Sequence, residues 1–238
     1  MIPHEVIPPF STDWWIYNLI TCLLIVITIW IGKNVPKKNE KKITLGIACL
    51  FIFEFFFMDF YNIYLGLWNL QDSLPLHLCS IMWFVSIYML ITKKLWAFEL
   101  LLFIGMPGGI HSLLTPELTH GDSLIHKIDF FLAHGGLVLA PLYAIFVLKM
   151  WPRKSSWLLS FIKLQLLVIT VGALNYLLEA NYMYLAHPPI ANNPLIPNEN
   201  SFFGQWPYYI IIFEIAVLAH AFIINLIINL PVLLKGKK

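Results

Sequence analysis

Residues 74–114, "LPLHLCSIMWFVSIYMLITKKLWAFELLLFIGMPGGIHSLL", contain two long apolar runs on either side of Lys93 and Lys94. A helix that crosses a bilayer needs about 20 mostly apolar residues. Each run is close to that length, so we expect residues 74–92 and 95–114 to form two adjacent membrane-spanning helices. The two lysines would lie in the short turn that joins them.

The composition of the whole chain agrees with this reading. The chain has 238 residues, of which 59% are hydrophobic and 12% are charged. Soluble domains carry about 25% charged residues, so the sequence predicts an integral membrane protein, organised as one domain over residues 1–238. The net charge of +2 and the lack of a basic stripe give no sign of a nucleic-acid partner.

The same apolar pattern recurs along the chain and predicts an all-α, polytopic membrane protein. Residues 1–10 lack the basic region and the cleavage site of a signal peptide. No internal repeat is visible, and the connections are too short for a soluble domain. We expect seven spanning helices, at residues 13–32, 43–66, 74–92, 95–114, 127–149, 156–180 and 207–233.

The basic residues predict the orientation of the bundle, because loops rich in Lys and Arg remain on the cytoplasmic side. Of the 15 basic residues, 13 fall on one side if the seven spans are correct. The N-terminus is then outside and the C-terminus is cytoplasmic, in a protein of the plasma membrane. The 13 residues are Lys33, Lys37, Lys38, Lys41, Lys42, Lys93, Lys94, Lys149, Arg153, Lys154, Lys235, Lys237 and Lys238.

Two connections on the predicted outer side are distinctive. Residues 115–126 are polar and contain two histidines, and residues 181–206 form a long, proline- and aromatic-rich connection. Long loops of this kind are often lids over a functional site. The other interpretation, a passive connector that rests on the bundle, has equal support from the sequence.

Several ionisable or polar side chains fall inside the predicted spans. Each such residue costs about 2.5–3.5 kcal/mol at the bilayer centre and usually faces the bundle interior or a wet cavity. Most of them lie in the outer half of their spans, and this shared depth is the main indication of a functional site. Glu99 is nearer the cytoplasmic side, and we expect it to lie close to Lys93 and Lys94. The others are Glu54, Asp59, His77, His111, His134, Asn175, Glu179, Glu214 and His220.

Cys79 lies close to the predicted outer start of its helix. Pro75 suits a first helical turn, and Ser73 or Asp72 can cap it. The unpaired N–H groups and the dipole of a helix N-terminus favour a negative charge such as a thiolate. A low dielectric opposes that charge, so a partner base must decide whether the thiol is activated.

Two histidines are candidates for that base. His77 is two residues from Cys79 and therefore points about 200° away around the helix. His134 belongs to another span at matching depth, where Gly135 and Gly136 allow helices to approach closely. A Cys–His pair across two helices makes a nucleophile with its base, and we predict Cys79 and His134 in these roles. The expected supporting or substrate-binding residues are His77, His111, Asp59, Asn175, Glu179 and Glu214.

The string of Pro107, Gly108 and Gly109 permits two interpretations. It can open the helix and direct His111 or free N–H groups at an oxyanion. It can also be a simple Pro/Gly kink, which we favour. Cys22 and Cys49 are interpreted as small apolar packing residues, and Cys79 considered alone would be as well.

Other classes of function remain possible from the residues alone. A zinc-dependent hydrolase would draw on His77, His111, His134, Glu179 or Glu214, but no H-x-x-x-H or H-E-x-x-H spacing is present. We therefore expect no metal and no cofactor. A small transporter or lipid-binding receptor would also use buried carboxylates and histidines, although no inverted repeat supports it.

Three motifs resemble the transmembrane-protein-164 family, including its bacterial integral-membrane relatives. They are "LPLHLCS" (74–80) with a tryptophan upstream, "PGGIHSLLTPEL" (107–118) and "FFLAHGGLVLAPLY" (130–143). The resemblance covers most of the chain and implies an acyltransferase that moves fatty acyl chains between phospholipids and lysophospholipids. It implies that Cys79 is the acyl-accepting cysteine and His134 the catalytic histidine. This family is also distantly similar to intramembrane hydrolases of lipid esters, which use a Thr–His pair.

Overall fold

The computed structural model describes residues 4–121, 123–190 and 201–235, with side chains described as far as residue 230. Most of the described chain is helical, its strands are only two residues long each, and the predicted all-α bundle is confirmed. The long helices are α1 (Thr12–Asn34), α2 (Lys37–Tyr64), α3 (Leu78–Thr92), α6 (Leu124–Phe146), α7 (Ser156–Leu178) and α8 (Tyr208–Lys235), together with the composite rod α4 (Leu95–Leu100), η1 (Leu101–Gly105) and α5 (Met106–Leu114).

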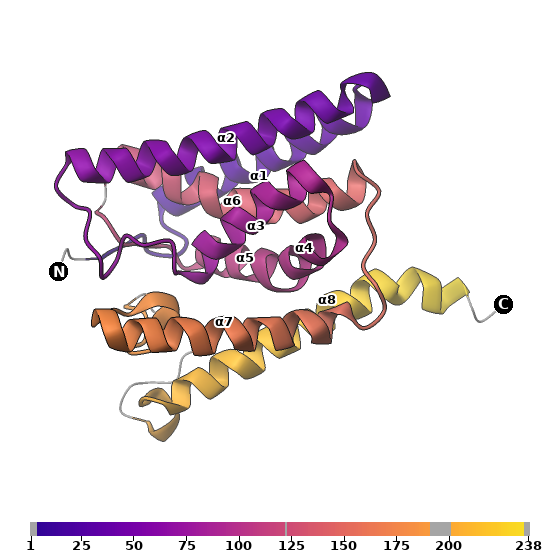
Figure 1. The fold of residues 1–238 in the computed structure, drawn as a ribbon. Helices are drawn as coiled ribbons and strands as arrows, with labels where there is room; N and C mark the ends of the chain where they lie inside the picture. The colour runs from indigo at the N-terminus through magenta and orange to yellow at the C-terminus, as the bar shows by residue number, and fades with distance from the viewer. Residues whose placement is uncertain (1–3, 122, 191–200, 236–238) are drawn as a thin grey trace.

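The helices are arranged in three groups (Figure 1). Helices α1 and α2 lie along one side, α6, α3 and the α4–α5 rod occupy the middle, and α7 and α8 lie together on the opposite side. The middle helices supply most of the fully buried side chains, whereas α1 and α8 expose apolar side chains along most of their lengths. Exposed apolar faces of this length are expected where a protein faces lipid.

Six of the helical rods are long and apolar enough to cross a membrane. The seventh, α3, has 15 residues and begins at Leu78 rather than at residue 74. The preceding backbone is held in turns, because the N–H of Leu74 donates to the Tyr182 hydroxyl at 2.9 Å and that of Leu76 to the Leu74 carbonyl at 2.7 Å. The expected first-turn Pro75 therefore lies outside the helix.

The cap of α3 also differs from the prediction. His77 is the N-cap residue, with an extended backbone and no side-chain capping bond. Ser73 instead accepts a hydrogen bond from the Asn69 N–H at 3.1 Å, and the Asn69 side chain accepts one from the Asp72 N–H at 2.9 Å. Ser73 and Asp72 are thus part of the turn before the helix, and neither caps it.

The fourth rod continues without opening through Pro107, Gly108 and Gly109. Directly before this segment, η1 is a π-helical stretch in which all five residues are buried. A proline cannot donate to the helical ladder and its ring crowds the carbonyl four residues earlier, which here belongs to Phe103. We attribute the π-helical stretch to this displacement, and the interpretation of the segment as an opened helix is not supported.

Glycines in α6 bring helices into close contact. A Cβ atom at Gly135 would collide with Thr21 of α1, and one at Gly136 would collide with the Trp83 ring of α3. Trp83 is itself stacked on Phe51 of α2, with ring centroids 3.9 Å apart. The predicted close approach at this glycine pair is confirmed, and it connects α1, α2, α3 and α6.

At the end of the bundle that is predicted to be cytoplasmic, Glu99 has a partner that the sequence did not indicate. Its side chain is only 2% exposed and forms an ion pair with Arg153, Nη2 to Oε2, at 2.5 Å. The Arg153 backbone N–H donates to the same carboxylate at 2.9 Å. The partner is therefore the connection between α6 and α7 and not Lys93, which pairs with Glu40 at 3.1 Å.

The predicted outer end carries short irregular elements that cover the bundle. Strand β1 (Glu5–Val6) pairs antiparallel with β2 (Glu117–Leu118). The 3-10 turn η2 (Tyr182–Tyr184) follows α7, and η3 (Phe202–Gly204) precedes α8. For the long outer connection, residues 181–206, a lid and a passive connector had equal support. The structure describes its residues 181–190 and 201–206, while residues 191–200 lie outside the described part of the chain.

Substituting Gly136 by alanine should destabilise the bundle. The new Cβ would press on Trp83 and lie 2.9 Å from Phe51 Cζ, and overpacking of this kind costs about 1–3 kcal/mol. We expect a lower midpoint of thermal unfolding in detergent, followed by tryptophan fluorescence. Gly46→Ala is the matched control, because nothing lies within 4 Å of a Cβ atom there; equal midpoints for the two variants would contradict this account.

Candidate functional site

A cavity of about 480 Å³ lies inside the bundle, lined by α2, α3, α5, α6, α7, α8 and the outer connections. Pockets for small molecules in proteins typically enclose about 300–1,000 Å³. Carboxylates, histidines and Cys79 contribute to the lining, and its described residues include no lysine or arginine. Helices α7 and α8 contribute apolar side chains to the lining, among them Leu164, Val168, Phe213 and Val217, beside the polar Glu214 and His220.

Cys79 is the second residue of α3 and lines this cavity. The first hydrogen bond across the helix start runs from the Ile81 N–H to the His77 carbonyl at 3.0 Å. The N–H groups of Leu78, Cys79 and Ser80 precede it, in the turn where helices leave their donors unpaired. The cysteine thus lies directly at a set of backbone donors, closer to the helix end than the sequence predicts.

The neighbours of the Cys79 sulfur come from α5. The Ser112 hydroxyl is its hydrogen-bond partner, with Sγ and Oγ 3.9 Å apart. A Cβ atom built on Gly108, one helical turn earlier, would lie 4.0 Å from the sulfur. Gly108 and Ser112 therefore form one face of α5 that borders the thiol, and the missing side chain of Gly108 leaves room beside it.

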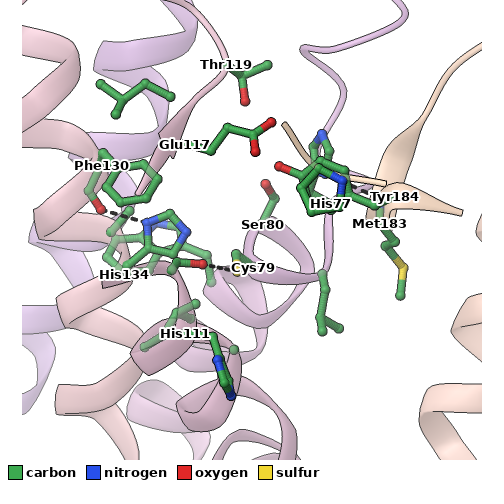
Figure 2. Close-up of a pocket in the computed structure, with 18 of the residues that line it drawn as sticks. His77, Cys79, Ser80, His111, Glu117, Thr119, Phe130, His134, Met183 and Tyr184 are labelled. Atoms are coloured by element: carbon green, nitrogen blue, oxygen red, sulfur yellow. Dashed lines mark hydrogen bonds between the residues drawn. The ribbon is translucent and has the colours of Figure 1, made fainter. Parts of the chain in front are cut away.

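His134 lines the same cavity from α6 (Figure 2). Its Nδ1 atom donates to the Phe130 carbonyl at 2.7 Å, and the Phe130 ring lies against the imidazole with centroids 4.1 Å apart. This bond assigns the proton of the neutral ring to Nδ1 and leaves the Nε2 lone pair free to accept another. Figure 2 shows the ring with its free edge toward the pocket that Cys79 borders.

Among the described residues no hydrogen bond joins Cys79 to His134, and helix α5 has neighbours of both on two of its faces. Gly108 borders Cys79, and a Cβ atom on the next residue, Gly109, would lie 2.8 Å from the His134 carbonyl oxygen and 3.0 Å from Leu137 Cβ. Consecutive helical residues point about 100° apart. The glycine pair thus allows α5 to lie against α6 on one side and to border the cysteine on the other.

Four of the six expected supporting residues line the cavity: His77, His111, Asp59 and Glu214. Each already has a protein partner. His77 Nδ1 accepts from the Met183 N–H at 3.3 Å, and Asp59 accepts from Trp68 Nε1 at 2.8 Å. Figure 2 shows His77 on the side of the pocket formed by Met183 and Tyr184, away from His134.

The remaining two cavity residues make contacts with α8 or from it: His111 joins α5 to α8, and Glu214 joins α8 to α7. His111 Nε2 lies 3.1 Å from His220 Nε2 on α8, and His220 Nδ1 donates to the Ala216 carbonyl at 2.6 Å. With a single proton between them, one of the two Nε2 atoms donates this hydrogen bond and the other accepts it. Glu214 accepts from Gln165 of α7 at 2.6 Å.

Asn175 and Glu179 are not among the cavity-lining residues, which corrects their expected place at the site. Asn175 is buried and clamps η2, with its Nδ2 donating to the Tyr182 carbonyl and its Oδ1 accepting from the Tyr182 N–H, each at 2.9 Å. Glu179 is exposed at the C-terminal cap of α7, in a left-handed conformation. Their position along α7 did not reveal the direction in which the two side chains point from the helix, and that direction keeps both out of the cavity lining.

Sequence reasoning missed Ser112 and Asp129. Both line the cavity, and the side chains of Asp129 and Glu54 are hydrogen-bonded to each other across α6 and α2. Helical periodicity offered a signal: on α6, residues 126, 129, 130, 133, 134 and 137 line the cavity, which follows the three- and four-residue spacing of one helix face. A search along that face from His134 would have found Asp129.

The outer mouth of the cavity is held by contacts between distant segments. His4 Nδ1 and Glu117 Oε1 are 2.7 Å apart, Ser73 Oγ and His120 Nε2 are 3.0 Å apart, and Tyr184 is hydrogen-bonded to Glu117. The described part of the outer connection contributes Met183, Tyr184, Leu185 and Pro189 to the lining. These contacts place the N-terminal strand and η2 over the polar end of the cavity.

No three His, Cys, Asp or Glu side chains among residues 4–121, 123–190 and 201–230 lie in a group that could hold a metal ion. The zinc-dependent alternative therefore has no ligand set in this part of the chain. The chemistry available at the site is that of a thiol, imidazoles, carboxyl groups and backbone donors.

The fold and the cavity define the class: an all-helical, polytopic integral membrane protein with a cysteine- and histidine-lined cavity inside its bundle. The sequence model of the TMEM164 family matches residues 9–225. The chain therefore belongs to the TMEM164 family. Searches of curated proteins and of solved structures found no match.

The contact between His4 and Glu117 should make the outer cap pH-dependent. The hydrogen bond to Glu117 raises the pKa of His4 above its ordinary value of 6.5, against the opposing effect of burial. A group whose pKa is raised in the folded protein stabilises the fold fully at a pH below its ordinary pKa. This stabilisation is lost as the pH rises through the raised pKa. The pairing of β1 with β2 should therefore loosen as the pH rises above 6.5.

Hydrogen exchange of the amides in β1 and β2, corrected for intrinsic rates, measures this loosening. His4→Gln keeps a polar side chain but cannot carry the charge, so its exchange should not depend on pH in that range beyond the intrinsic effect. If the variant and the original protein showed the same corrected pH dependence, the ion pair would not be its source.

Proposed function

We propose that this protein is a membrane-embedded acyltransferase that moves a fatty acyl chain between phospholipids and lysophospholipids through a thioester on Cys79. The observation that supports this most directly is the presence of both Cys79 and His134 in the lining of one internal cavity. Membership of the TMEM164 family is consistent with it, because the resemblance of the three motifs implies the same activity.

In the first half-reaction, His134 Nε2 takes the proton of the Cys79 thiol. The thiolate attacks the carbonyl carbon of a lipid ester, forming a tetrahedral intermediate. The carbon–oxygen bond then breaks, and the leaving lysolipid oxygen receives the proton from the imidazolium. The acyl chain remains on sulfur as a thioester, and the imidazole is again neutral.

In the second half-reaction, the hydroxyl of an acceptor lysolipid gives its proton to His134 Nε2 and attacks the thioester carbonyl. The carbon–sulfur bond breaks, the new ester leaves, and the thiolate recovers the proton. Water in place of the lysolipid would release a free fatty acid, so transfer and hydrolysis share the first step. Neither half-reaction requires a cofactor.

The bond from His134 Nδ1 to the Phe130 carbonyl keeps Nε2 as the basic atom throughout, because it fixes both the tautomer and the ring orientation. The negative oxygen of each tetrahedral intermediate needs donors close to the sulfur. The free N–H groups at the start of α3 and the Ser112 hydroxyl, 3.9 Å from Sγ, are in a position to supply them.

The apolar wall of the cavity suits an acyl chain. Leu164 and Val168 of α7 line the cavity, as do Phe213 and Val217 of α8. A chain bound between these helices would keep water away from the thioester, which favours transfer over hydrolysis. With the predicted orientation, the substrates would enter from the outer leaflet of the plasma membrane.

The proposal predicts a covalent acyl group on Cys79. Purified protein incubated with an alkyne-tagged phospholipid should carry a label that neutral hydroxylamine removes, and mass spectrometry should locate it on residue 79. Cys79→Ala should abolish the label, while Cys22→Ser and Cys49→Ser, which change exposed thiols of α1 and α2, should retain it. A labelled Cys79→Ala protein would contradict the mechanism.

Removing the base should slow acylation without abolishing binding. Loss of a general base typically lowers the rate about 10²- to 10⁴-fold, so we expect a fall of this size for His134→Ala in the rate of label formation. The KM for the donor lipid should change little. An unchanged rate would show that His134 is not the base, even if the thioester on Cys79 were confirmed.

A further inference from the structure

Helix α8 lines the cavity with one face and meets the membrane with another. Phe213 and Val217 belong to the cavity lining, whereas the side chains of Ile211 and Ile215 are exposed. Exposed apolar side chains on a membrane-spanning helix face lipid. On this side, therefore, only the thickness of one helix separates the cavity from the surrounding lipid.

Helix α5 forms the neighbouring part of the wall in the same way. His111 and Ser112 line the cavity, whereas Ile110 and Leu114 are exposed. The boundary between α5 and α8, which we call the α5–α8 seam, thus has the cavity on one side and membrane lipid on the other.

A pair of histidines joins the two helices at this seam. His111 Nε2 lies 3.1 Å from His220 Nε2, and the two rings meet edge to face with centroids 4.8 Å apart. Among the hydrogen bonds between described residues, this is the one that joins α5 or α6 to α8. A hydrogen bond between two neutral groups contributes little net free energy, so this bond can open and close. Ionisable residues within spans also often mark the pathway of a substrate.

Packing fixes α8 at both ends of the seam. Toward the predicted cytoplasmic side, Ala221 is fully buried and belongs to the main apolar core. Toward the outer side, Tyr209 is fully buried and its hydroxyl donates to the Tyr184 carbonyl at 2.6 Å. All cavity-lining residues of α8 fall between these two points, within residues 210–220, which cover about 15 Å of helix. The seam is therefore a segment of limited length, and the histidine pair lies at its inner end.

The other side of the α7–α8 pair, where α7 approaches α3, is closed more firmly. Tyr182 is fully buried there, its hydroxyl donates to the Leu70 carbonyl at 2.8 Å and accepts from the Leu74 N–H at 2.9 Å. Val171 is buried in the same apolar cluster, against which Ile81 of α3 packs. Several hydrogen bonds and a dry cluster would have to separate on this side, compared with one hydrogen bond at the α5–α8 seam.

We propose that the α5–α8 seam is the lateral entrance through which a lipid of the outer leaflet passes into the cavity, and that the His111–His220 pair holds its inner end closed. The acyl chain crosses between the apolar side chains of the two helices, while the head group stays near the outer surface. This inference rests on the proposed function for the identity of the lipid, whereas the path itself does not depend on acyl transfer.

The test measures how fast Cys79 is modified from two directions. Cys22→Ser with Cys49→Ser leaves Cys79 as the only thiol of the chain, and this protein is placed in phospholipid nanodiscs. N-hexadecylmaleimide is confined to the bilayer and must arrive from lipid, whereas the permanently charged trimethylammonium-ethyl methanethiosulfonate must arrive from water. The readout is the ratio of the lipid-borne rate to the water-borne rate, in which changes in the reactivity of the thiol itself cancel.

Loss of the histidine pair should favour the lipid-borne reagent. We expect His220→Ala, which removes the ring and its bond, to raise the ratio about fivefold, the factor that one neutral hydrogen bond represents. His220→Gln, whose amide can still bond to His111, should keep the ratio close to that of the original protein. Gln71→Ala is the matched control, because it removes a 3.4 Å hydrogen bond to the Leu178 carbonyl on the α3–α7 side and should not change the ratio.

Filling the seam should have the opposite effect. Ala216 lies one helical turn outward of His220 and lines the cavity, so an indole there would occupy the seam. We expect Ala216→Trp to lower the ratio by at least the factor by which His220→Ala raises it. Ala219→Trp places the same side chain at an exposed position of α8 outside the cavity lining, and it should leave the ratio unchanged.

Four results would overturn the inference: an unchanged ratio in His220→Ala or in Ala216→Trp, an equal rise for His220→Ala and Gln71→Ala, an equal fall for both tryptophan variants, or no modification of Cys79 by the lipid-borne reagent in the original protein. If His220→Ala does not fold, the tryptophan pair decides alone. Neither reagent requires acyl transfer, so failure to form a thioester would contradict the proposed function without changing this outcome.

Discussion

The contact of α5 with α6 at Gly109 is the constraint on which the candidate site depends. No side chain fits between the backbone at Gly109 and the His134 carbonyl, where a Cβ atom would have only 2.8 Å. This contact lets the neighbouring Gly108 and Ser112 reach the Cys79 sulfur from the other face of α5. The π-helical stretch Leu101–Gly105 lies directly before the segment that carries these glycines, and short π-helical stretches of this kind often occur at functional sites.

The polar groups of the bundle follow two patterns with different energetic consequences. Glu99 is buried but fully paired with Arg153, and Asn175 is buried and fully bonded to η2, so both contribute to holding the fold together. On the cavity, His134 is bonded through Nδ1 and leaves Nε2 without a hydrogen-bond partner among the described residues. A buried polar atom without a hydrogen bond costs free energy unless a ligand supplies the bond. This distinguishes the residues of the candidate site from polar residues whose hydrogen bonds are all made within the fold.

Much of the architecture was predictable because lipid imposes a simple requirement of length and apolarity on each span. The seven helical rods and the close approach at Gly135 and Gly136 follow from that requirement and from the small size of glycine. The start of α3 was not predictable, since it depends on the Tyr182 hydroxyl, which lies far away in sequence and binds the Leu74 N–H. The position of Cys79 and His134 along their spans was enough to predict that both line one cavity. The side of the helix to which each side chain points was not predicted, and Glu179 does not line the cavity. Asp129 was overlooked although it lies on the same face of α6 as His134.

The shortness of α3 affects the surrounding bilayer. A helix of 15 residues extends over about 22 Å, which is less than the hydrocarbon thickness of about 30 Å. The turns at residues 66–77, which connect the end of α2 to the start of α3, take the place of further helical turns at this end of the rod. Local thinning of the bilayer is one way in which a membrane accommodates a short span, and thinning beside α3 would bring the head groups of neighbouring lipids closer to Cys79 at the start of this helix.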